Sequence, residues 1–246
     1  MARSLLGIDI GGSGIKGAPV DPVAGTHEDR TKIKTPQPAT PSACAEVVAE
    51  IVRVQGVPGP VGVTVPGVVR DGVVWSAANI DQSWIGTDAR ALFAEATGRD
   101  VLVINDADAA GIAEMRFGAG RGRGGTVAVL TFGTGIGSAL FVDGILASNT
   151  ELGHIEFHGG DAEHYVSGKL RNELPLEAWT ERISEYLSHV DFVLGIDLVV
   201  FGGGISKEWD SFAELLDVPV EVVPAQLRNY AGIVGAAVAA HEAFPG

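Results

Sequence analysis

One pattern occurs twice in this sequence: an apolar strand, a glycine-rich turn and a second strand. The first copy covers residues 4–20 with its turn at 11–14, and the second covers residues 126–142 with its turn at 133–137. Short apolar runs bounded by glycines are typical of strands joined by tight turns. Two such copies do not make a solenoid array, whose repeats are only about 20–50 residues long. The sequence therefore predicts a duplicated α/β protein in which two lobes face a cleft.

The remaining elements alternate between helical and strand patterns in both halves. A small N-terminal lobe is expected at residues 1–107 and a larger C-terminal lobe at residues 108–230, with a helix at 231–244 packing on the first lobe. Thr40 or Ser42, and then Thr87 or Asp88, are placed to cap the first two helices. Helices are predicted at 43–54, 88–98, 107–117, 176–194 and 231–243, and further strands at 61–65, 101–104, 197–201 and 220–223.

Composition excludes several classes of function. The net charge is −14 and the pI is near 4.7, which argues against nucleic-acid binding because phosphate neutralisation needs clustered Lys and Arg. No apolar run reaches the roughly 18 residues of a membrane span, and Asp9 falls where a signal peptide needs its apolar core. With Cys44 as the single cysteine, no intrachain disulfide can form, and we expect a cytoplasmic protein.

The first glycine turn formally satisfies a dinucleotide-binding pattern, G-x-G-x-x-G, at residues 12–17. That pattern binds a pyrophosphate only when a helix follows, and Pro19 with its β-type neighbours opposes a helix. A glycine hairpin can still bind phosphate, because its backbone N–H groups approach an anion closely. Asp9 is placed to hold Mg²⁺ through water and Lys16 to supply a positive charge. The alternative for either glycine turn alone is a plain β-turn.

Five motifs in this order resemble those of the ROK sugar kinases, within the actin-like, hexokinase/ribonuclease H-like ATPase fold. Residues 9–16 resemble the first phosphate motif of the family and residues 131–137 the second. Asn105-Asp106 resembles its sugar-binding pair, residues 151–154 its E-x-G-H motif, and residues 200–206 its adenosine-side loop. The motifs span residues 7–237, so the resemblance covers nearly the whole chain and implies that fold.

The resemblance implies a role for each motif residue. Asp106 is expected to be the catalytic base, although Asn105-Asp106 alone would also suit a helix cap. The implied sugar-binding residues are Asn79, Asn105, Asp106, Glu151, His154 and Glu163, with Gly67 as a rim contact. The implied phosphate and Mg²⁺ residues are Asp9, Gly11, Gly12, Ser13, Gly14, Lys16, Thr134 and Gly135. The implied nucleotide-side residues are Gly202, Gly203 and Gly204.

Cysteine usage indicates one branch of the family. Most ROK kinases have a zinc site in which the His of E-x-G-H is joined by three downstream cysteines, and this chain has no cysteine after Cys44, so we expect no zinc site. His154, His158 and His164 suggest another metal site, but solvated or sugar-facing histidines fit a strand-and-loop segment better. In lacking these cysteines, the chain resembles one branch of the family, the polyphosphate glucokinases and polyphosphate/ATP-glucomannokinases.

This resemblance implies phosphoryl transfer from polyphosphate or ATP, with Mg²⁺, to the 6-hydroxyl of glucose, with mannose left open as an acceptor. It also implies a homodimer. Because the protein is acidic, attraction of polyphosphate has to be local, and the candidate contacts are Arg121 and Arg123, or Lys169 and Arg171. The alternative is that these residues form solvated basic loops.

Three other functions are alternatives to this one. The first is a strictly ATP-dependent hexose or N-acetylhexosamine kinase. The second is an inert ROK-type sugar-binding regulator, which intact Asp9, Lys16 and Asp106 oppose. The third is a ROK-type repressor, whose DNA-binding segment would precede the phosphate motif that begins here at residue 7.

Overall fold

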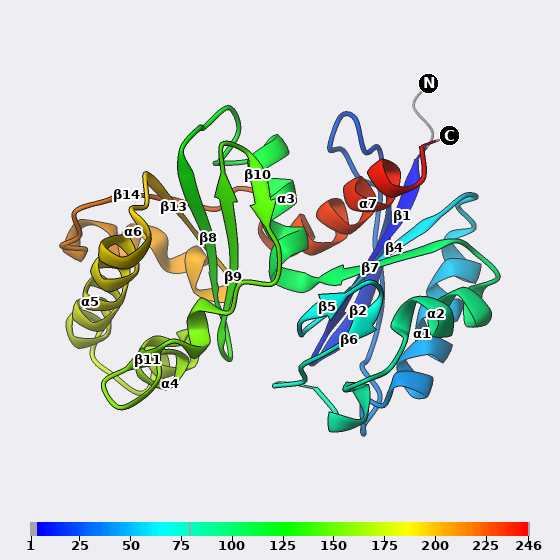
Figure 1. The fold of residues 1–246 in the computed structure, drawn as a ribbon, viewed down its shortest axis with the longest axis horizontal. Coiled ribbons are helices and arrows are strands. Elements are labelled where there is room, and N and C mark those ends of the chain that lie inside the picture. Colours follow the sequence, from blue (N-terminus) through cyan, green and yellow to red (C-terminus); the bar gives the residue numbers. More distant parts are fainter. Residues whose placement is uncertain (1–3, 79, 246) are drawn as a thin grey trace. The chain divides into compact units, whose positions relative to one another are not determined.

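The computed structural model describes residues 4–78 and 80–245. The chain divides into unit 1, residues 1–113 and 230–246, and unit 2, residues 114–229. Within the described residues, each unit is built on a five-stranded mixed sheet, with strand order β3-β2-β1-β4-β7 in unit 1 and β10-β9-β8-β13-β14 in unit 2. In both orders the first two pairings are antiparallel and the last two are parallel. The matching topology confirms the predicted duplication and the α/β fold (Figure 1).

The strand and helix bounds follow the predicted pattern closely. The strands of unit 1 are β1 Leu5–Gly11, β2 Gly14–Val20, β3 Thr31–Ile33, β4 Val61–Val65, β5 Val69–Arg70, β6 Val73–Val74 and β7 Val101–Asn105. Those of unit 2 are β8 Thr126–Phe132, β9 Ile136–Val142, β10 Ile145–Ala147, β11 Glu156–Phe157, β12 Gly160–Asp161, β13 Leu198–Gly202 and β14 Glu221–Pro224. The α-helices are α1 Pro41–Gln55, α2 Ala89–Thr97, α3 Asp106–Phe117, α4 Glu163–Val166, α5 Leu176–Leu194, α6 Trp209–Phe212 and α7 Ala231–Ala243.

Several bounds differ from the sequence prediction by one or two residues, and two of these differences lie beside predicted site motifs. Helix α3 begins at Asp106 rather than at residue 107. The second glycine turn is shorter than predicted, because Ile136 pairs with Phe132 in the β8–β9 register and so belongs to the strand. The predicted caps are confirmed, since the side chains of Thr40 and Asp88 accept hydrogen bonds from the first turns of α1 and α2.

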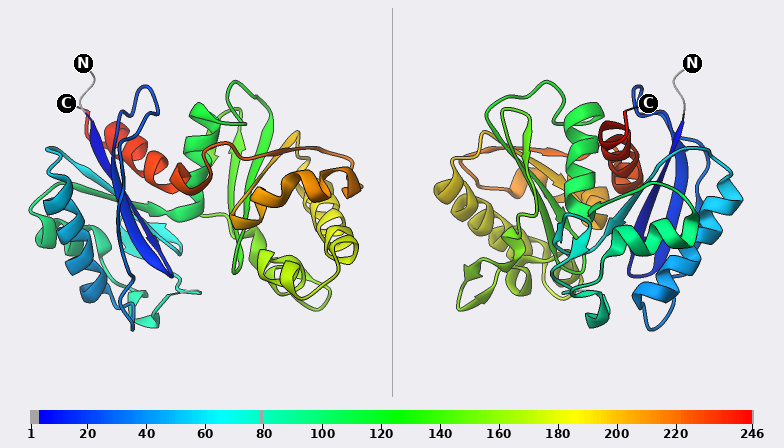
Figure 2. Two further views of the ribbon diagram at one scale, coloured as in Figure 1. Left: turned by 180° about the vertical axis from the view of Figure 1, so that it is seen from behind. Right: turned by 45° about the vertical axis from the view of Figure 1, so that its right-hand side comes forward.

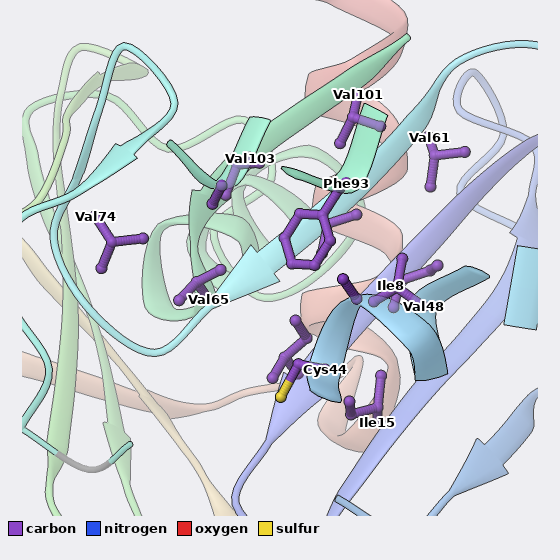
Figure 3. Close-up of a cluster of buried hydrophobic side chains, with 14 of the residues drawn as sticks. Ile8, Ile15, Cys44, Val48, Val61, Val65, Val74, Phe93, Val101 and Val103 are labelled. Atoms are coloured by element: carbon purple, nitrogen blue, oxygen red, sulfur yellow. The ribbon is translucent and has the colours of Figure 1, made fainter. Parts of the chain in front are cut away.

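One face of the unit 1 sheet packs against α1 and α2 (Figure 3). Residues alternate between the two faces of a strand, and Ile8 and Val63 point into this core with Val48 of α1 and Phe93 of α2. All four side chains are buried. Burial of such apolar area is the main stabilising contribution to a core of this kind.

The other face of the same sheet packs against α7, which lies beside β1 and β4 in Figures 1 and 2. The approach is close because glycines meet the helix backbone. A Cβ at Gly7 or Gly62 would lie 1.9 Å from a carbonyl oxygen of α7, and one at Gly235 would lie 1.7 Å from the Ala109 oxygen. No side chain larger than hydrogen can occupy these positions without moving the backbone.

In unit 2, α5 covers one face of the sheet. Its buried residues include Trp179 and Tyr186, which pack in a cluster with Phe132 of β8 and Phe201 of β13. The Phe132 and Phe201 rings stack with centroids 4.4 Å apart. The cluster fixes the strand ends that lead into the two glycine loops of this unit. In the described part of the chain, no helix has the length and apolarity needed to cross a membrane.

Candidate active site in two parts

In unit 1 the β1–β2 hairpin brings Asp9 and Lys16 together. The two residues are directly opposite in the antiparallel register, and Lys16 Nζ lies 3.2 Å from Asp9 Oδ2. Directly opposed residues on one face of a sheet have neighbouring side chains. The carboxylate and the ammonium group predicted for the first phosphate motif, Asp9 and Lys16, therefore form one ion pair.

Two further residues surround the Asp9 carboxylate. Thr64 lies beside Asp9 on parallel strand β4, and its hydroxyl donates to Asp9 Oδ1 at 3.1 Å. The same hydroxyl accepts from the Ile10 N–H. Gly232, in the first turn of α7, is so close that a Cβ there would lie 3.1 Å from Asp9 Oδ1. Asp9 is thus oriented by Lys16, by Thr64 and by the space that a glycine leaves.

The first glycine turn is exposed at its tip. Gly12 and Ser13 are exposed, while the Gly11 carbonyl accepts a hydrogen bond from the Thr35 hydroxyl. Gly11 and Gly12 form one wall of a pocket of about 280 Å³ that Thr35, Gln37 and other residues of unit 1 complete. The N–H groups of an exposed turn are available to an anion.

Asn105 and Asp106 lie where β7 ends and α3 begins. Asn105 is 6% exposed, and its Nδ2 donates to the Gly67 carbonyl at 3.0 Å while its Oδ1 accepts from the Asp108 N–H at 2.9 Å. Asn105 therefore caps α3 and links it to the predicted rim residue Gly67. Asp106 Oδ1 accepts from the Ala107 N–H, and the residue is partly exposed.

The strand order places Asp9 and Asn105 at the same edge of the unit 1 sheet, where its parallel strands have their carboxyl ends. Strands β1, β4 and β7 are parallel neighbours, with Asp9 opposite Thr64 and Val65 opposite Asn105. Asp9 and Asn105 are hence two strands apart, roughly 10 Å at the usual spacing. In open α/β sheets ligands bind outside the carboxyl ends of parallel strands.

In unit 2 the second glycine turn is held from two sides. The Lys169 N–H donates to the Gly133 carbonyl at 3.0 Å, and Gly203, at φ 85°, approaches the backbone of Phe132. Thr134 is exposed and Gly135 partly exposed. The predicted second phosphate loop, the predicted nucleotide-side glycine Gly203 and the basic residue Lys169 are therefore neighbours.

The predicted sugar-binding residues of unit 2 form a cluster of carboxylates around one imidazole. His154 Nδ1 lies 2.9 Å from Asp161 Oδ2, and His154 Nε2 lies 3.8 Å from Glu151 Oε2. Glu163 Oε2 accepts from the Ile136 N–H at 3.2 Å, which joins this cluster to the first residue of β9, directly after the second glycine turn. Asp161 is a member that sequence reasoning missed.

This cluster changes the acidity of two of its members. Burial of the His154 ring lowers its pKa, but the Asp161 hydrogen bond and the nearby carboxylates of Glu163 and Glu151 outweigh this, so the pKa is raised above 6.5. Burial raises the pKa of Glu151, an effect that His154 opposes and Glu163 reinforces. The arrangement supplies both donors and acceptors for sugar hydroxyls.

A second pocket, of about 450 Å³, lies beyond Gly203 and Gly204 and is formed by residues of unit 2. Its lining includes Ser206, Lys207 and Trp209, which follow the nucleotide-side glycines in the sequence, and Gln226 from the opposite segment. Gly202 is buried, whereas Gly203 and Gly204 are exposed.

The four predicted polyphosphate contacts differ in their surroundings. Arg121 and Lys169 are exposed. Arg123 forms a two-point ion pair with Glu221, and Arg171 Nε lies 3.4 Å from Glu208 Oε2. Their role in polyphosphate binding stays a prediction.

Two further predictions concern Asn79 and a metal site at the histidines. Asn79 lies outside the described residues. Within residues 4–78 and 80–245, no group of three or more His, Cys, Asp and Glu side chains is arranged to hold a metal ion. His158 contacts Glu185 instead.

Sequence reasoning missed Thr64, Asp161 and Gly232, which orient motif residues without belonging to a motif. Thr64 carried one signal, a polar residue inside the apolar strand Val61–Val65. The sequence around Asp161 and Gly232 gave no such signal, because the residues that they contact lie on other elements.

Comparison with known proteins adds a family and several relatives. The model of the ROK family matches residues 5–168. The polyphosphate glucokinase of Mycobacterium tuberculosis is 50% identical over 96% of this chain and 91% of its own length. The crystal structure of the inorganic polyphosphate/ATP-glucomannokinase of Arthrobacter sp. strain KM superposes with a TM-score of 0.94 at 48% identity, covering 98% of this chain and 100% of that one. A ROK family glucokinase from Streptomyces griseus, in complex with glucose and AMPPNP, gives a TM-score of 0.83 at 25% identity, covering 97% and 99%.

Proposed function

Because the chain belongs to the ROK family, we propose that it transfers a phosphoryl group from inorganic polyphosphate or ATP to the 6-hydroxyl of glucose. The observation that carries this proposal is the identity of half the residues with a polyphosphate glucokinase along nearly the whole chain. The proposed motif residues also have the required surroundings, since Asp9 and Lys16 are paired and Asp106 is partly exposed at a strand end.

We assign the role of general base to Asp106. Its carboxylate accepts the proton of the 6-hydroxyl as that oxygen attacks the terminal phosphorus, and the bond from phosphorus to the donor oxygen breaks. A carboxylate within hydrogen-bond reach suffices for this transfer. Asn105 positions Asp106 by capping α3 and by holding the Gly67 carbonyl.

Hydroxyl recognition is assigned to residues with mixed donor and acceptor character. Asn105, Glu151, His154 and Glu163 take this role, with Asp161 fixing the His154 ring. A site built to hydrogen-bond hydroxyl groups rejects compounds that lack them, because its own polar groups are then left without partners.

The donor phosphates are assigned to the glycine turns, with Mg²⁺ as the cofactor. Asp9 suits this ion, because Mg²⁺ is usually bound by one or two carboxylates together with waters and substrate phosphates. Each Asp9 oxygen has one described protein partner and so keeps acceptor capacity for metal-bound water. When bound there, the ion would neutralise negative charge on the transferring group. Lys16 adds a positive charge beside Asp9, and Gly12 and Ser13 supply backbone N–H donors from an exposed turn.

A strictly ATP-dependent kinase is the second candidate. The pocket of about 450 Å³ beyond Gly204 favours it, since Trp209 in its lining suits the base of a nucleotide and Lys207 suits the negative charge of its phosphates. Polyphosphate has no nucleoside, so only ATP would use this pocket. We prefer the proposal in which the enzyme uses both donors, because the chain is similar to a polyphosphate/ATP-glucomannokinase.

A coupled assay for hexose 6-phosphate tests the proposal. Glucose and Mg²⁺ are supplied with either polyphosphate or ATP, and mannose replaces glucose in a parallel series. Asp106→Asn removes the base with little change in size, and Asp29→Asn, at an exposed site of the same unit, is the matched control. We expect product with both donors, at least about 100-fold less in Asp106→Asn, and unchanged rates in the control.

The outcomes separate the candidates. Product from ATP alone would establish the second candidate. No product from either hexose with either donor would overturn the proposal and favour a sugar-binding regulator. The assembly as a homodimer and the cytoplasmic location belong to the proposal as well, and light scattering of the purified protein tests the first.

A further inference from the structure

The short hairpin β11–β12 connects the acceptor residues that we assign in unit 2. It begins two residues after His154 and ends two residues before Glu163. Asp161, on its second strand, makes the 2.9 Å contact with the His154 ring. Any movement of this hairpin therefore moves the partner of His154 and the start of the helix that carries Glu163.

The hairpin itself has little to hold it in place. Each strand has two residues, paired as Glu156 with Asp161 and Phe157 with Gly160. Isolated two-stranded hairpins are marginally stable even when longer. The turn residues His158 and Gly159 both have positive φ, 54° and 80°, which costs energy for a residue other than glycine. Its position has to be fixed by contacts with other elements.

Those contacts converge on one carboxylate of α5. His158 Nε2 lies 2.7 Å from Glu185 Oε1, and the Tyr165 hydroxyl donates to Glu185 Oε2 at 3.3 Å. Both oxygens of Glu185 are thus occupied, one by the hairpin and one by α4. The His158 and Tyr165 rings stack on each other, with centroids 4.4 Å apart and planes at 26°.

Two neighbours support the same arrangement. Phe157, which is buried, contacts the edges of the His158, Tyr165 and Tyr186 rings. Arg182, one turn before Glu185, lies over the Tyr165 ring at 4.4 Å and donates to the Tyr165 carbonyl at 3.3 Å. Helix α5 is a 19-residue element whose inner face is in the unit 2 core, so it is a rigid support.

We propose that Glu185 is a positioning residue for the sugar acceptor, acting through His158 and Tyr165 to fix the hairpin that carries Asp161 and leads to Glu163. Glu185 touches neither His154 nor Glu163, and its effect is on acceptor binding rather than on the base or the donor. The inference rests on the proposed function, because it assigns a support to the acceptor half of that same site.

Steady-state kinetics with glucose as the varied substrate tests this. Glu185→Ala removes both hydrogen bonds at an exposed position, and Glu185→Gln keeps an oxygen that can accept one of them. Glu181→Ala is the matched control, since it removes a carboxylate of the same helix that makes neither hydrogen bond. We expect Glu185→Ala to raise the glucose KM roughly three- to tenfold and to change kcat and the polyphosphate KM less than about twofold. Glu185→Gln should restore much of the loss.

A second measurement follows the hairpin directly. Amide hydrogen exchange of residues 156–163 should be faster in Glu185→Ala than in the wild type or in Glu181→Ala, because a released hairpin opens more often. If the wild type is active and Glu185→Ala changes neither the glucose KM nor the exchange, the role of Glu185 is overturned and the proposed function stands. A lower unfolding temperature with an unchanged glucose KM would show a merely structural role and overturn it too. A wild type that phosphorylates no hexose would overturn the proposed function, and this inference with it.

Discussion

Asp9 and Lys16 face each other across the β1–β2 hairpin, with Lys16 Nζ 3.2 Å from Asp9 Oδ2. In the hairpin register they are paired residues, so the ion pair follows from strand pairing and not from a chance approach of two long side chains. The pair presents a carboxylate for a hydrated Mg²⁺ and an ammonium for a phosphate side by side.

Replacing Asp9 by Asn is expected to reduce kcat by about 100-fold or more, since the carboxylate charge that would hold Mg²⁺ is lost. The Mg²⁺ concentration for half-maximal rate should rise as well. Both are measured by titrating Mg²⁺ in the coupled assay. An Asp9→Asn enzyme with wild-type Mg²⁺ dependence would remove Asp9 from the metal role.

Gly232→Ala tests the space beside Asp9. The added Cβ would lie 3.1 Å from Asp9 Oδ1, so the carboxylate has to shift by a few tenths of an ångström. We expect kcat to fall roughly tenfold, because small displacements of catalytic groups are costly. Thermal unfolding should change little, since alanine favours a helix more than glycine does.

Gly235→Ala, in the same helix, is the contrasting variant. Its Cβ would lie 1.7 Å from the Ala109 oxygen, so backbone has to move and stability should fall by about 1–3 kcal/mol or more. Urea unfolding separates the two variants. Equal stability loss in both would contradict a specific effect of Gly232 on Asp9.

The raised pKa of His154 predicts a pH dependence of stability. In the folded protein the ring holds its proton above the ordinary value of 6.5, so the folded state binds more protons than the unfolded state in that window. The stabilising contribution is therefore fully present below about pH 6.5 and is lost as the pH rises through the folded pKa. Urea unfolding at several pH values should show this decline in the wild type and a smaller one in His154→Gln. Parallel curves for the two proteins would contradict it.

Lys169→Ala is expected to raise the polyphosphate KM roughly three- to tenfold and to leave the glucose KM unchanged. The Lys169 backbone is bonded to Gly133 of the second phosphate loop, which places its exposed side chain near that loop. Arg123→Ala should have a smaller effect, since Glu221 already balances the charge of Arg123. Kinetics at two salt concentrations check both, because an exposed charge acts less strongly at high salt. A larger effect in Arg123→Ala would favour the basic loop 116–123 as the polyphosphate contact.

Local sequence features were enough to predict much of the fold. The two hairpins, the caps at Thr40 and Asp88 and the helix at 176–194 depend on neighbouring residues, and all were recovered. The second glycine turn was predicted two residues too long, because glycine content marks a turn but does not show which residue begins the next strand. Ile136 begins β9 by pairing with Phe132.

The candidate site was predictable only where a motif is contiguous. Asp9, Lys16 and the Asn105-Asp106 pair are such cases. The partners Thr64, Asp161 and Gly232 are joined to the motifs by pairing and packing between elements, and a single sequence gives no distance between such residues. Glu185 is a further example, since an exposed Glu on an amphipathic helix is ordinarily a solvated residue.

The close packing of α7 on β1 and β4 has a consequence for biosynthesis. Unit 2 is one continuous stretch, residues 114–229, so all of its residues have been added to the chain before α7 is synthesised. Unit 1 cannot be completed at that stage, because the face of its sheet that carries Gly7 and Gly62 is still without its helix. The residues that come first in synthesis thus depend for their native packing on the residues that come last. A chain interrupted before residue 231 would keep Asp9, Lys16 and Asp106 yet lack the helix whose first turn lies beside Asp9.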